Sequence, residues 1–346
     1  EQVPIWPGCM SIGVLHARHR KPARLDIGQS HADTRSEAGA ARPDILHQNS
    51  PKGYAPYNDR MTRSATAADL SVAVSRFRAE PTAGVFASPR YRLRYLSWGH
   101  PAAPPVVVVH GMNDNPLSFA MVLVRLVDAG LRCVAYDLPD GRDGANLGMY
   151  KHPHYAADLV ALLDHLGIAK TDVLGSSFGS TIVLRALAEY PDRFRRAALQ
   201  GGFPRRPLKR IERGLARLGR YWPWRMGDLP IRESVMRRLE KPFFAGTDDA
   251  VFEFLLQNSS RTPIRAMCRR TLIIDRLDLR PLLPKIPHPL LLIGGDRDPL
   301  VPRHLEAEVE AGVPNARRVE FAPCGHYPQY TVPGPMADEL IRFFRP

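Results

Sequence analysis

Short apolar runs alternate with longer segments of helical spacing from about residue 90 to the end of the chain. Residues 90–98 alternate polar and apolar positions, which is typical of a strand with one exposed face. Four consecutive valines at 106–109 favour a strand buried on both faces of a parallel sheet. Other strands are expected at 131–139, 197–202 and 289–293, and helices at 115–129, 155–166 and 336–344. The alternation predicts an α/β fold, a mostly parallel sheet with helices on both faces.

A long segment interrupts this alternation between the strand that ends near residue 202 and the one that begins near residue 289. It is far longer than an ordinary crossover connection. Four apolar positions near its start follow helical spacing: Leu208, Ile211, Leu215 and Leu218. We therefore predict an inserted helical lid over residues 204–285, between core segments 67–203 and 286–346. Trp222 and Trp224 in this segment either line a substrate pocket or anchor a turn.

The first 66 residues have a different character. They are rich in Pro, Gly, Ala, Ser, His and Arg and show no sustained periodicity, so we predict a disordered N-terminal extension. No charged stub followed by an apolar stretch opens the chain, and no run of eighteen apolar residues occurs. Neither a signal peptide nor a membrane span is predicted, and we expect a cytoplasmic location.

Residues 175–179 read Gly-Ser-Ser-Phe-Gly, a Gly-x-Ser-x-Gly motif between an apolar run and a helical pattern. Ser177 would then lie in a sharp strand-to-helix turn, with its hydroxyl at the helix N-terminus. Gly175 and Gly179 are needed there because a Cβ at either position would collide with the neighbouring strand and helix. The motif alone is equally compatible with a glycine-lined turn that contains a serine.

Two later strands end in polar residues that complete a nucleophilic site. The strand that begins at residue 289 runs into a turn with Asp296 and Asp298, and the strand that begins at residue 318 leads to His326. A serine hydroxyl is a poor nucleophile near neutral pH. An imidazole with a pKa near 6.5 can accept its proton while a carboxylate orients the imidazole. The order serine, acid, histidine along the chain is the one expected for a serine in this kind of turn.

The acid turn contains the pattern Gly-x-x-Asp-x-x-Val-Pro, formed by Gly295, Asp298, Val301 and Pro302. This arrangement resembles the acid turn of the α/β-hydrolase superfamily. Asp298 is therefore preferred as the acid, and Asp296 is expected to cap or brace the turn. Some members of the superfamily take their acid from the end of the preceding strand, but residues 197–202 contain no carboxylate here.

The resemblance covers about residues 88–346 and implies a serine hydrolase. It implies a catalytic triad of Ser177, Asp298 and His326. It also implies an oxyanion hole, in which each backbone N–H donor stabilises developing negative charge by roughly 3–4 kcal/mol. By resemblance, the donors are the N–H groups of Met112 and Phe178, and the side chain of His110 only packs and forms hydrogen bonds within its loop.

The charge of the chain is unevenly distributed. The sequence has 48 Lys and Arg, 35 Asp and Glu, and a formal net charge of +13 at pH 7. Residues 204–285 hold 19 of these basic residues and 9 of the acidic ones, so most of the excess lies in the predicted lid. The excess is compatible with anionic substrates or with contact to anionic lipid surfaces, although we favour solvated helix faces. No motif or aromatic stacking pattern supports nucleic-acid binding.

Four cysteines and twelve histidines are scattered without metal-ligand or redox spacing. We therefore expect no metal, no cofactor and no disulfide framework. The sequence leaves the oligomeric state open.

The predicted function is cleavage of a carboxylic ester of a small molecule through a covalent acyl-enzyme. The same triad serves carbon–carbon bond hydrolases, and it also serves aminopeptidases, for which the lid acids Asp248, Asp249 and Glu253 would be needed to capture an amine. A further alternative is a non-catalytic module that uses the pocket to bind a ligand.

Overall fold

An eight-stranded sheet organises the computed structural model, which describes residues 64–345. Residues 1–63, most of the segment predicted to be disordered, lie outside the described residues. The strands are β1 (Thr82–Ala87), β2 (Arg92–Trp98), β3 (Pro105–Val109), β4 (Arg132–Tyr136), β5 (Thr171–Ser176), β6 (Phe194–Gln200), β7 (Leu290–Gly295) and β8 (Ala316–Phe321). Across the sheet they follow the order β1-β2-β4-β3-β5-β6-β7-β8. β2 pairs antiparallel with β1 and β4, and the other five strand pairs of the sheet are parallel, so the prediction of a mostly parallel α/β sheet is confirmed.

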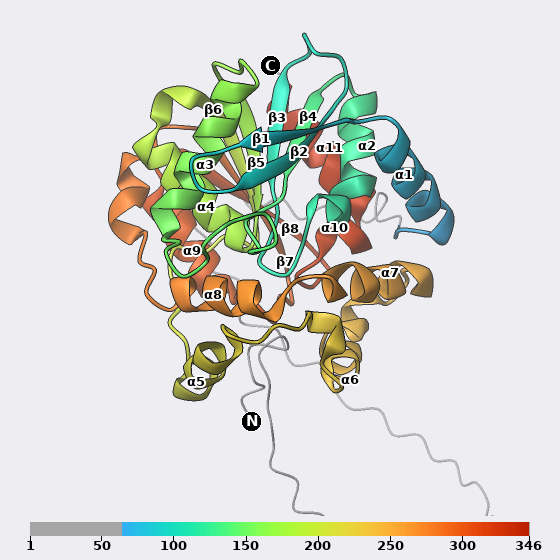
Figure 1. Ribbon diagram of the computed structural model, residues 1–346. Coiled ribbons are helices and arrows are strands. Elements are labelled where there is room, and N and C mark those ends of the chain that lie inside the picture. The colour runs from blue at the N-terminus through green and yellow to red at the C-terminus, as the bar shows by residue number, and fades with distance from the viewer. Residues whose placement is uncertain (1–63, 346) are drawn as a thin grey trace, which may run out of the picture. The chain divides into compact units, whose positions relative to one another are not determined.

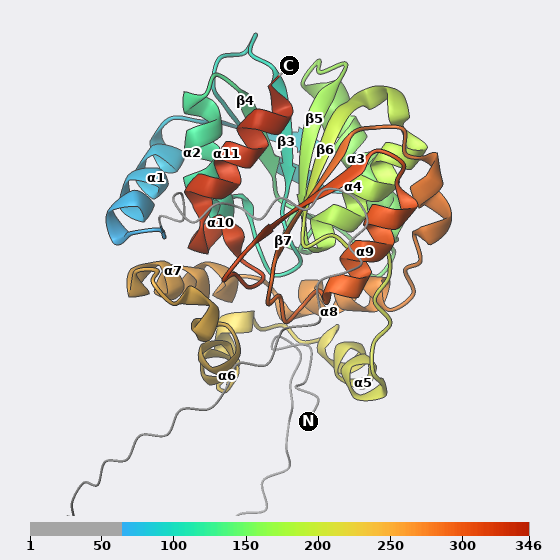
Figure 2. The same ribbon diagram turned by 180° about the vertical axis from the view of Figure 1, so that it is seen from behind.

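Helices cover both faces of the sheet (Figures 1 and 2). One face carries α1 (Ala67–Ala79), α2 (Ala120–Asp128) and α11 (Pro333–Phe344), and the other carries α3 (His152–His165), α4 (Phe178–Glu189) and α9 (Arg303–Gly312). The valines of β3 alternate between these layers. Val106 and Val108 join the apolar cluster with α2 and α11, while Val107 and Val109 join the cluster with α3 and α4. Burial on both faces explains why this strand is apolar at every position.

The first helix and strand of the fold were not predicted from the sequence. A capping box starts α1, in which the Thr66 hydroxyl accepts the N–H of Asp69 at 3.1 Å and the Asp69 carboxylate accepts the N–H of Thr66 at 3.2 Å. β1 is an edge strand whose residues are mostly exposed, and it pairs only with β2. An edge strand needs no continuous apolar face, so the hydrophobic pattern gave little sign of it.

The residues between β6 and β7, called here the β6–β7 segment (201–289), are helical. They form α5 (Arg210–Gly219), α6 (Arg232–Leu239), α7 (Asp249–Ser260) and α8 (Ile264–Ile274), joined by short 3₁₀ turns. Figure 1 shows these helices across one end of the sheet, at the bottom of the view. Parallel strands present their carboxyl ends, and the loops that follow them, at a single edge. None of the helices formed by residues 64–345 is long and apolar enough to cross a membrane.

The four apolar residues with helical spacing at 208–218 differ in burial, since Leu208 is buried, Leu215 is half-buried and the other two are exposed. Ile211 and Leu218 are 65% and 72% exposed, whereas Ala216 and Gly219 are buried. The small residues face α8, since a Cβ on Gly219 would lie 2.5 Å from the sulfur of Cys268. Close approach of the two helices therefore decides the orientation of α5. Trp222 and Trp224 follow it on the surface and do not line a pocket with Ser177.

Candidate active site

Ser177 occupies the turn between β5 and α4 in a strained conformation. Its φ and ψ are 50° and −114°, and it is the only residue other than glycine with positive φ within residues 64–345. Such a conformation costs on the order of 1–3 kcal/mol. A Cβ on Gly179 would lie 2.2 Å from the Val109 carbonyl oxygen, and one on Gly175 would lie 2.8 Å from the Gly179 carbonyl oxygen. The turn therefore requires both glycines.

His326 and Asp298 form a buried pair at the ends of β8 and β7. His326 Nδ1 lies 2.6 Å from Asp298 Oδ2, and both side chains are about 5% exposed or less. The other carboxylate oxygen of Asp298 accepts the N–H groups of Leu300 at 2.7 Å and Val301 at 2.9 Å. These backbone bonds hold the carboxylate in place and leave Oδ2 for the imidazole.

Asp296 and Gly201 explain why Asp298 is the acid that reaches His326. Asp296 accepts the N–H of Cys324 at 2.7 Å and so braces the β7 turn against the turn before His326. Gly201, directly after β6, has a φ of +57°, and a Cβ there would lie 2.9 Å from His326 Cε1. The missing side chain after β6 therefore leaves room for the imidazole ring.

Gln200, the last residue of β6, links the two halves of the site. Its carbonyl accepts the N–H of Ser177 at 2.7 Å, and its side-chain amide donates to the carbonyl of His326 at 2.7 Å. The Ser176 hydroxyl also bonds to its amide oxygen. Gln200 is 1% exposed, so this connection is shielded from water. It fixes the backbone of the serine turn relative to the histidine turn.

The side chain of His110 orients the peptide that carries the Met112 N–H. His110 Nε2 accepts the N–H of Leu138 at 3.0 Å, so Nδ1 carries the proton and donates to the Gly111 carbonyl at 2.8 Å. The C=O and N–H of a trans peptide point in opposite directions, so the Met112 N–H is directed away from the imidazole. Burial, followed by the charge of Arg270, lowers the pKa of His110 to about 3, which keeps the ring neutral.

Arg270 of α8 fixes the next peptide of the same loop. Its guanidinium donates to the carbonyls of Met112, Leu138 (3.1 Å) and Pro139 (3.0 Å), and the side chain is only 2% exposed. A buried arginine held by three carbonyls connects the β6–β7 segment to the loop after β3. Phe178 is the first residue of α4, where N–H groups have no partner within the helix.

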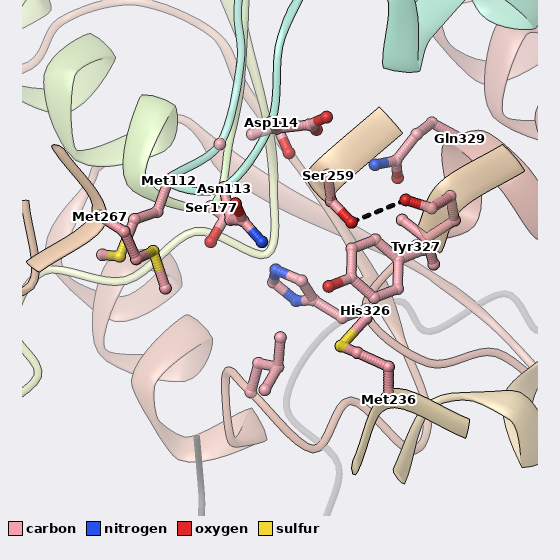
Figure 3. A pocket seen from close by; sticks show the side chains of 14 residues that line it. Met112, Asn113, Asp114, Ser177, Met236, Ser259, Met267, His326, Tyr327 and Gln329 are labelled. Atoms are coloured by element: carbon pink, nitrogen blue, oxygen red, sulfur yellow. Dashed lines mark hydrogen bonds between the residues drawn. The ribbon is translucent and has the colours of Figure 1, made fainter. Parts of the chain in front are cut away.

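A pocket of about 60 Å³ contains both Ser177 and His326 (Figure 3). Its walls come from the loop at 111–114, the serine turn, residues 326–329 and helices α6 to α8. The β6–β7 segment supplies Met236, Leu255, Ser259 and Met267. The segment therefore roofs the site, and the pocket brings together residues from distant parts of the chain. No cluster of His, Cys, Asp and Glu side chains suited to a metal ion occurs within residues 64–345.

The sequence model of the alpha/beta hydrolase family matches residues 106–339, more than half of the chain. The chain belongs to this family. The matched region contains the serine turn, the acid turn and the histidine turn, and the eight-stranded sheet has the expected fold.

Relatives of this hydrolase are named for several different substrates. The 3-hydroxybutyrate-oligomer hydrolase of Cupriavidus necator is 27% identical over 277 residues, which cover 71% of this chain and 91% of the relative. A 2-hydroxy-6-oxononadienedioate/2-hydroxy-6-oxononatrienedioate hydrolase of Pseudomonas sp. is 25% identical over 255 residues, 65% and 82% of the two chains. The enol-lactonase of Burkholderia xenovorans LB400 shares the fold, with a TM-score of 0.64 and 23% identity over 75% of this chain and 97% of the other. The protein is therefore a hydrolase by family.

Three further carboxyl groups lie close enough to influence the His326–Asp298 pair. Desolvation raises the pKa of Asp114 to about 7, of Glu240 to about 7 and of Glu306 to about 8. Glu306 forms an ion pair with Arg318 at 2.8 Å. Glu240, at the end of α6, is fully buried, and neither of its carboxylate oxygens has a hydrogen-bond partner among the described residues. Two buried acids, Glu240 and Glu306, and the half-buried Asp114 thus surround the pair.

The acids that the sequence suggested for amine capture do not line this pocket. They are Asp248, Asp249 and Glu253. Asp248 caps α7, Asp249 pairs with Lys241, and Glu253 pairs with Arg237 at 2.7 Å. These contacts hold the three acids within the β6–β7 segment, so the structure gives amine capture by them no support.

Sequence reasoning missed the acids and amides that do approach the site. Asp114 and Gln329 line the pocket, and each lies within three residues of a predicted site residue, so proximity in sequence could have indicated both. Gln200 and Glu240 offered no such signal. Their positions depend on how the β6–β7 segment and β8 pack against the end of the sheet.

Activity should decline toward acidic pH as His326 becomes protonated and can no longer accept a proton. Burial alone would lower the pKa of His326, but Asp298 and, less strongly, Glu240 and Glu306 raise it above its usual value. Negative charge near the ring stabilises the imidazolium, so Glu240→Gln should lower this pKa and move the acid limb of the kcat/KM profile to lower pH. The surface variant Glu253→Gln should leave the limb in place. Identical limbs for wild type and Glu240→Gln would contradict the prediction.

Proposed function

We propose that this hydrolase cleaves carboxylic esters through a covalent intermediate on Ser177. The main support is the buried His326–Asp298 hydrogen bond, which ends in the same pocket as a serine held in a strained turn at a helix N-terminus. Functional groups that cost stability and lie together in a pocket are typical of a catalytic site.

In the first half of the proposed reaction, Ser177 Oγ attacks the ester carbonyl. His326 donates Nδ1–H to Asp298, which leaves Nε2 free to take the serine proton. Asp298 holds this tautomer and stabilises the imidazolium that forms. His326 then donates the proton to the leaving alcohol, and the acyl group stays on Ser177.

The oxyanion that forms in this step would be held by the N–H groups of Met112 and Phe178. Their proposed role is supported by the orientation of the loop, where His110 and Arg270 bind the carbonyls of Gly111 and Met112. Preorganised donors need no rearrangement as charge develops, which is why they favour the transition state over the bound substrate.

In the second half, His326 activates water to attack the acyl-enzyme, and Ser177 is regenerated. We assign the role of a lid to the β6–β7 segment, because helices α6 to α8 cover the pocket and restrict access of water. We propose no metal or organic cofactor for this cycle.

Carbon–carbon bond cleavage is the second candidate, favoured by the relative from Pseudomonas sp.. The substrate in that protein's name is a dioate, which carries two carboxylates. The pocket beside Ser177 includes no Lys or Arg, but it does include Asp114. Ester cleavage is therefore the better supported function for this chain.

Labelling with a fluorophosphonate probe tests the proposal, together with turnover of p-nitrophenyl esters of graded chain length. We expect one adduct on the wild-type chain by intact mass, none on Ser177→Ala, and measurable ester hydrolysis by the wild type. The absence of both adduct and hydrolysis from folded wild-type protein would instead support a ligand-binding module.

A further inference from the structure

The pocket beside Ser177 has two chemically different ends. Figure 3 shows Met112 and Met267 on one side of Ser177 and His326, and Asp114, Ser259 and Gln329 on the other. The thioether side chains form an apolar wall. The opposite wall presents the carboxyl of Asp114 and the carboxamide of Gln329, so it is suited to a polar part of a ligand. The Ser259 hydroxyl on this side already donates to the Leu255 carbonyl at 2.7 Å and accepts from Arg232.

Asp114 has unused hydrogen-bonding capacity at this polar end. Its Oδ1 accepts the N–H of Asn115 at 3.0 Å, while Oδ2 has no hydrogen-bond partner among the described residues. Among residues 64–345, no Lys or Arg lines the pocket to neutralise it. Asp114 is half-buried, so a ligand that displaces water from this end must supply a hydrogen-bond donor to its carboxyl group.

Gln329 provides an independent observation at the same end. Its side chain is 1% exposed and lines the pocket, and its Oε1 has no partner within residues 64–345. The buried Oδ1 of Asn113, which precedes Asp114 in the chain and also lines the pocket, likewise has no partner among these residues. Leaving a buried polar atom unsatisfied is unfavourable, so these atoms are prepared for a group that supplies hydrogen-bond donors.

The chemistry of this end separates three classes of ligand group. The pKa of Asp114 is raised to about 7, so both of its protonation states are populated near neutral pH. A carboxylate is repelled by the ionised form. An ammonium has no hydrogen-bond acceptor of its own and gains no ion pair from the neutral form. A hydroxyl can donate to Asp114 or Gln329 and can also accept a hydrogen bond from the Gln329 amide.

We propose that the preferred substrates are esters that carry a hydroxyl group a few bonds from the scissile carbonyl, bound by Asp114 and Gln329. Esters with a carboxylate at that place are rejected. This inference rests on the proposed ester hydrolase function and adds the substrate class. It also assigns the basic surface of the β6–β7 segment no part in choosing the substrate.

Five esters of similar size test the substrate class. Ethyl butyrate is the reference, and ethyl 3-hydroxybutyrate and 2-hydroxyethyl butyrate place a hydroxyl on the acyl and the alcohol side. Monoethyl succinate carries a carboxylate, and ethyl 3-aminobutyrate carries an ammonium. We expect kcat/KM to be about 10-fold higher than the reference for at least one hydroxyl ester and about 10-fold lower for monoethyl succinate.

Substitutions assign the preference to residues. Asp114→Asn keeps an acceptor and removes the charge, so it should retain the hydroxyl preference and reduce the discrimination against monoethyl succinate. Asp114→Leu and Gln329→Leu each remove a hydrogen-bond acceptor. In both variants, the ratio of kcat/KM for the hydroxyl ester to kcat/KM for ethyl butyrate should fall toward 1. Asp192→Leu is the control, because Asp192 is exposed and lies just before β6, at the opposite end of that strand from the pocket. For this variant, kcat/KM of each ester relative to ethyl butyrate should equal the wild-type value.

The two proposals fail in different ways. Wild-type protein that hydrolyses none of the five esters would contradict the ester hydrolase function itself. Hydrolysis without a hydroxyl preference, a preference for the ammonium ester, or a hydroxyl preference unchanged in folded Asp114→Leu and Gln329→Leu would overturn only the substrate class.

Discussion

Replacing Ser177 by alanine should lower kcat for ester hydrolysis by at least about a thousandfold, because the proposed acyl-enzyme forms on its hydroxyl. The substitution removes one oxygen atom and keeps the Cβ, so the packing around Gly175 and Gly179 is preserved. We expect circular dichroism and the melting temperature to remain close to those of the wild type. Steady-state kinetics with a p-nitrophenyl ester would measure the loss.

An exposed serine provides the control for this change. Ser71 lies on α1, outside the pocket with Ser177, and Ser71→Ala should retain wild-type kcat and full fluorophosphonate labelling. Hydrolysis by folded Ser177→Ala at the wild-type rate would show that another group attacks the substrate, and the assignment of the nucleophile would have to be abandoned.

Replacing Asp298 by asparagine should reduce kcat by a factor on the order of 10³ to 10⁴. The asparagine retains the shape of the side chain and can still accept the N–H groups of Leu300 and Val301. It can then present an amide N–H to His326, which favours the wrong tautomer and provides no charge for the imidazolium. The pH profile of kcat should also change, since Asp298 is the group that most raises the pKa of His326.

The neighbouring carboxylate offers a matched control in the same turn. Asp296→Asn keeps the oxygen that accepts the Cys324 N–H, and Asp296 does not bond to His326. We expect its kcat to stay within a few-fold of the wild type. A larger loss for Asp296→Asn than for Asp298→Asn would reverse the assignment of the acid.

Much of the fold could be predicted because its signals are local. The valines at 106–109 indicated a strand buried on both faces, and the structure divides them between the two helical layers. By contrast, β1 was missed because an exposed edge strand carries no apolar pattern. The helical spacing of Ile211 and Leu218 did not reveal which side of α5 is buried, because the small residues Ala216 and Gly219 allow closer packing than the larger apolar residues would.

The candidate site also combines residues that the sequence predicts with residues that only the packing brings there. Ser177, Asp298 and His326 each follow a strand, and the turn chemistry around them is visible in short stretches of sequence. Arg270 was indistinguishable from the other basic residues of the β6–β7 segment, yet the structure places it on the carbonyl of Met112. Its position depends on the packing of α8 over the loop after β3.

The sequence by itself determined the class of fold, the strand-to-helix turn at Ser177 and the order of the residues that follow the strands, because spacing and turn chemistry act over a few neighbouring residues. The tertiary structure decided which polar groups meet in the pocket. Asp114, Gln329 and Ser259 come from a loop, a short helix and the β6–β7 segment. Contacts between residues so far apart in the chain depend on how whole elements pack, and short-range patterns carry no record of that packing.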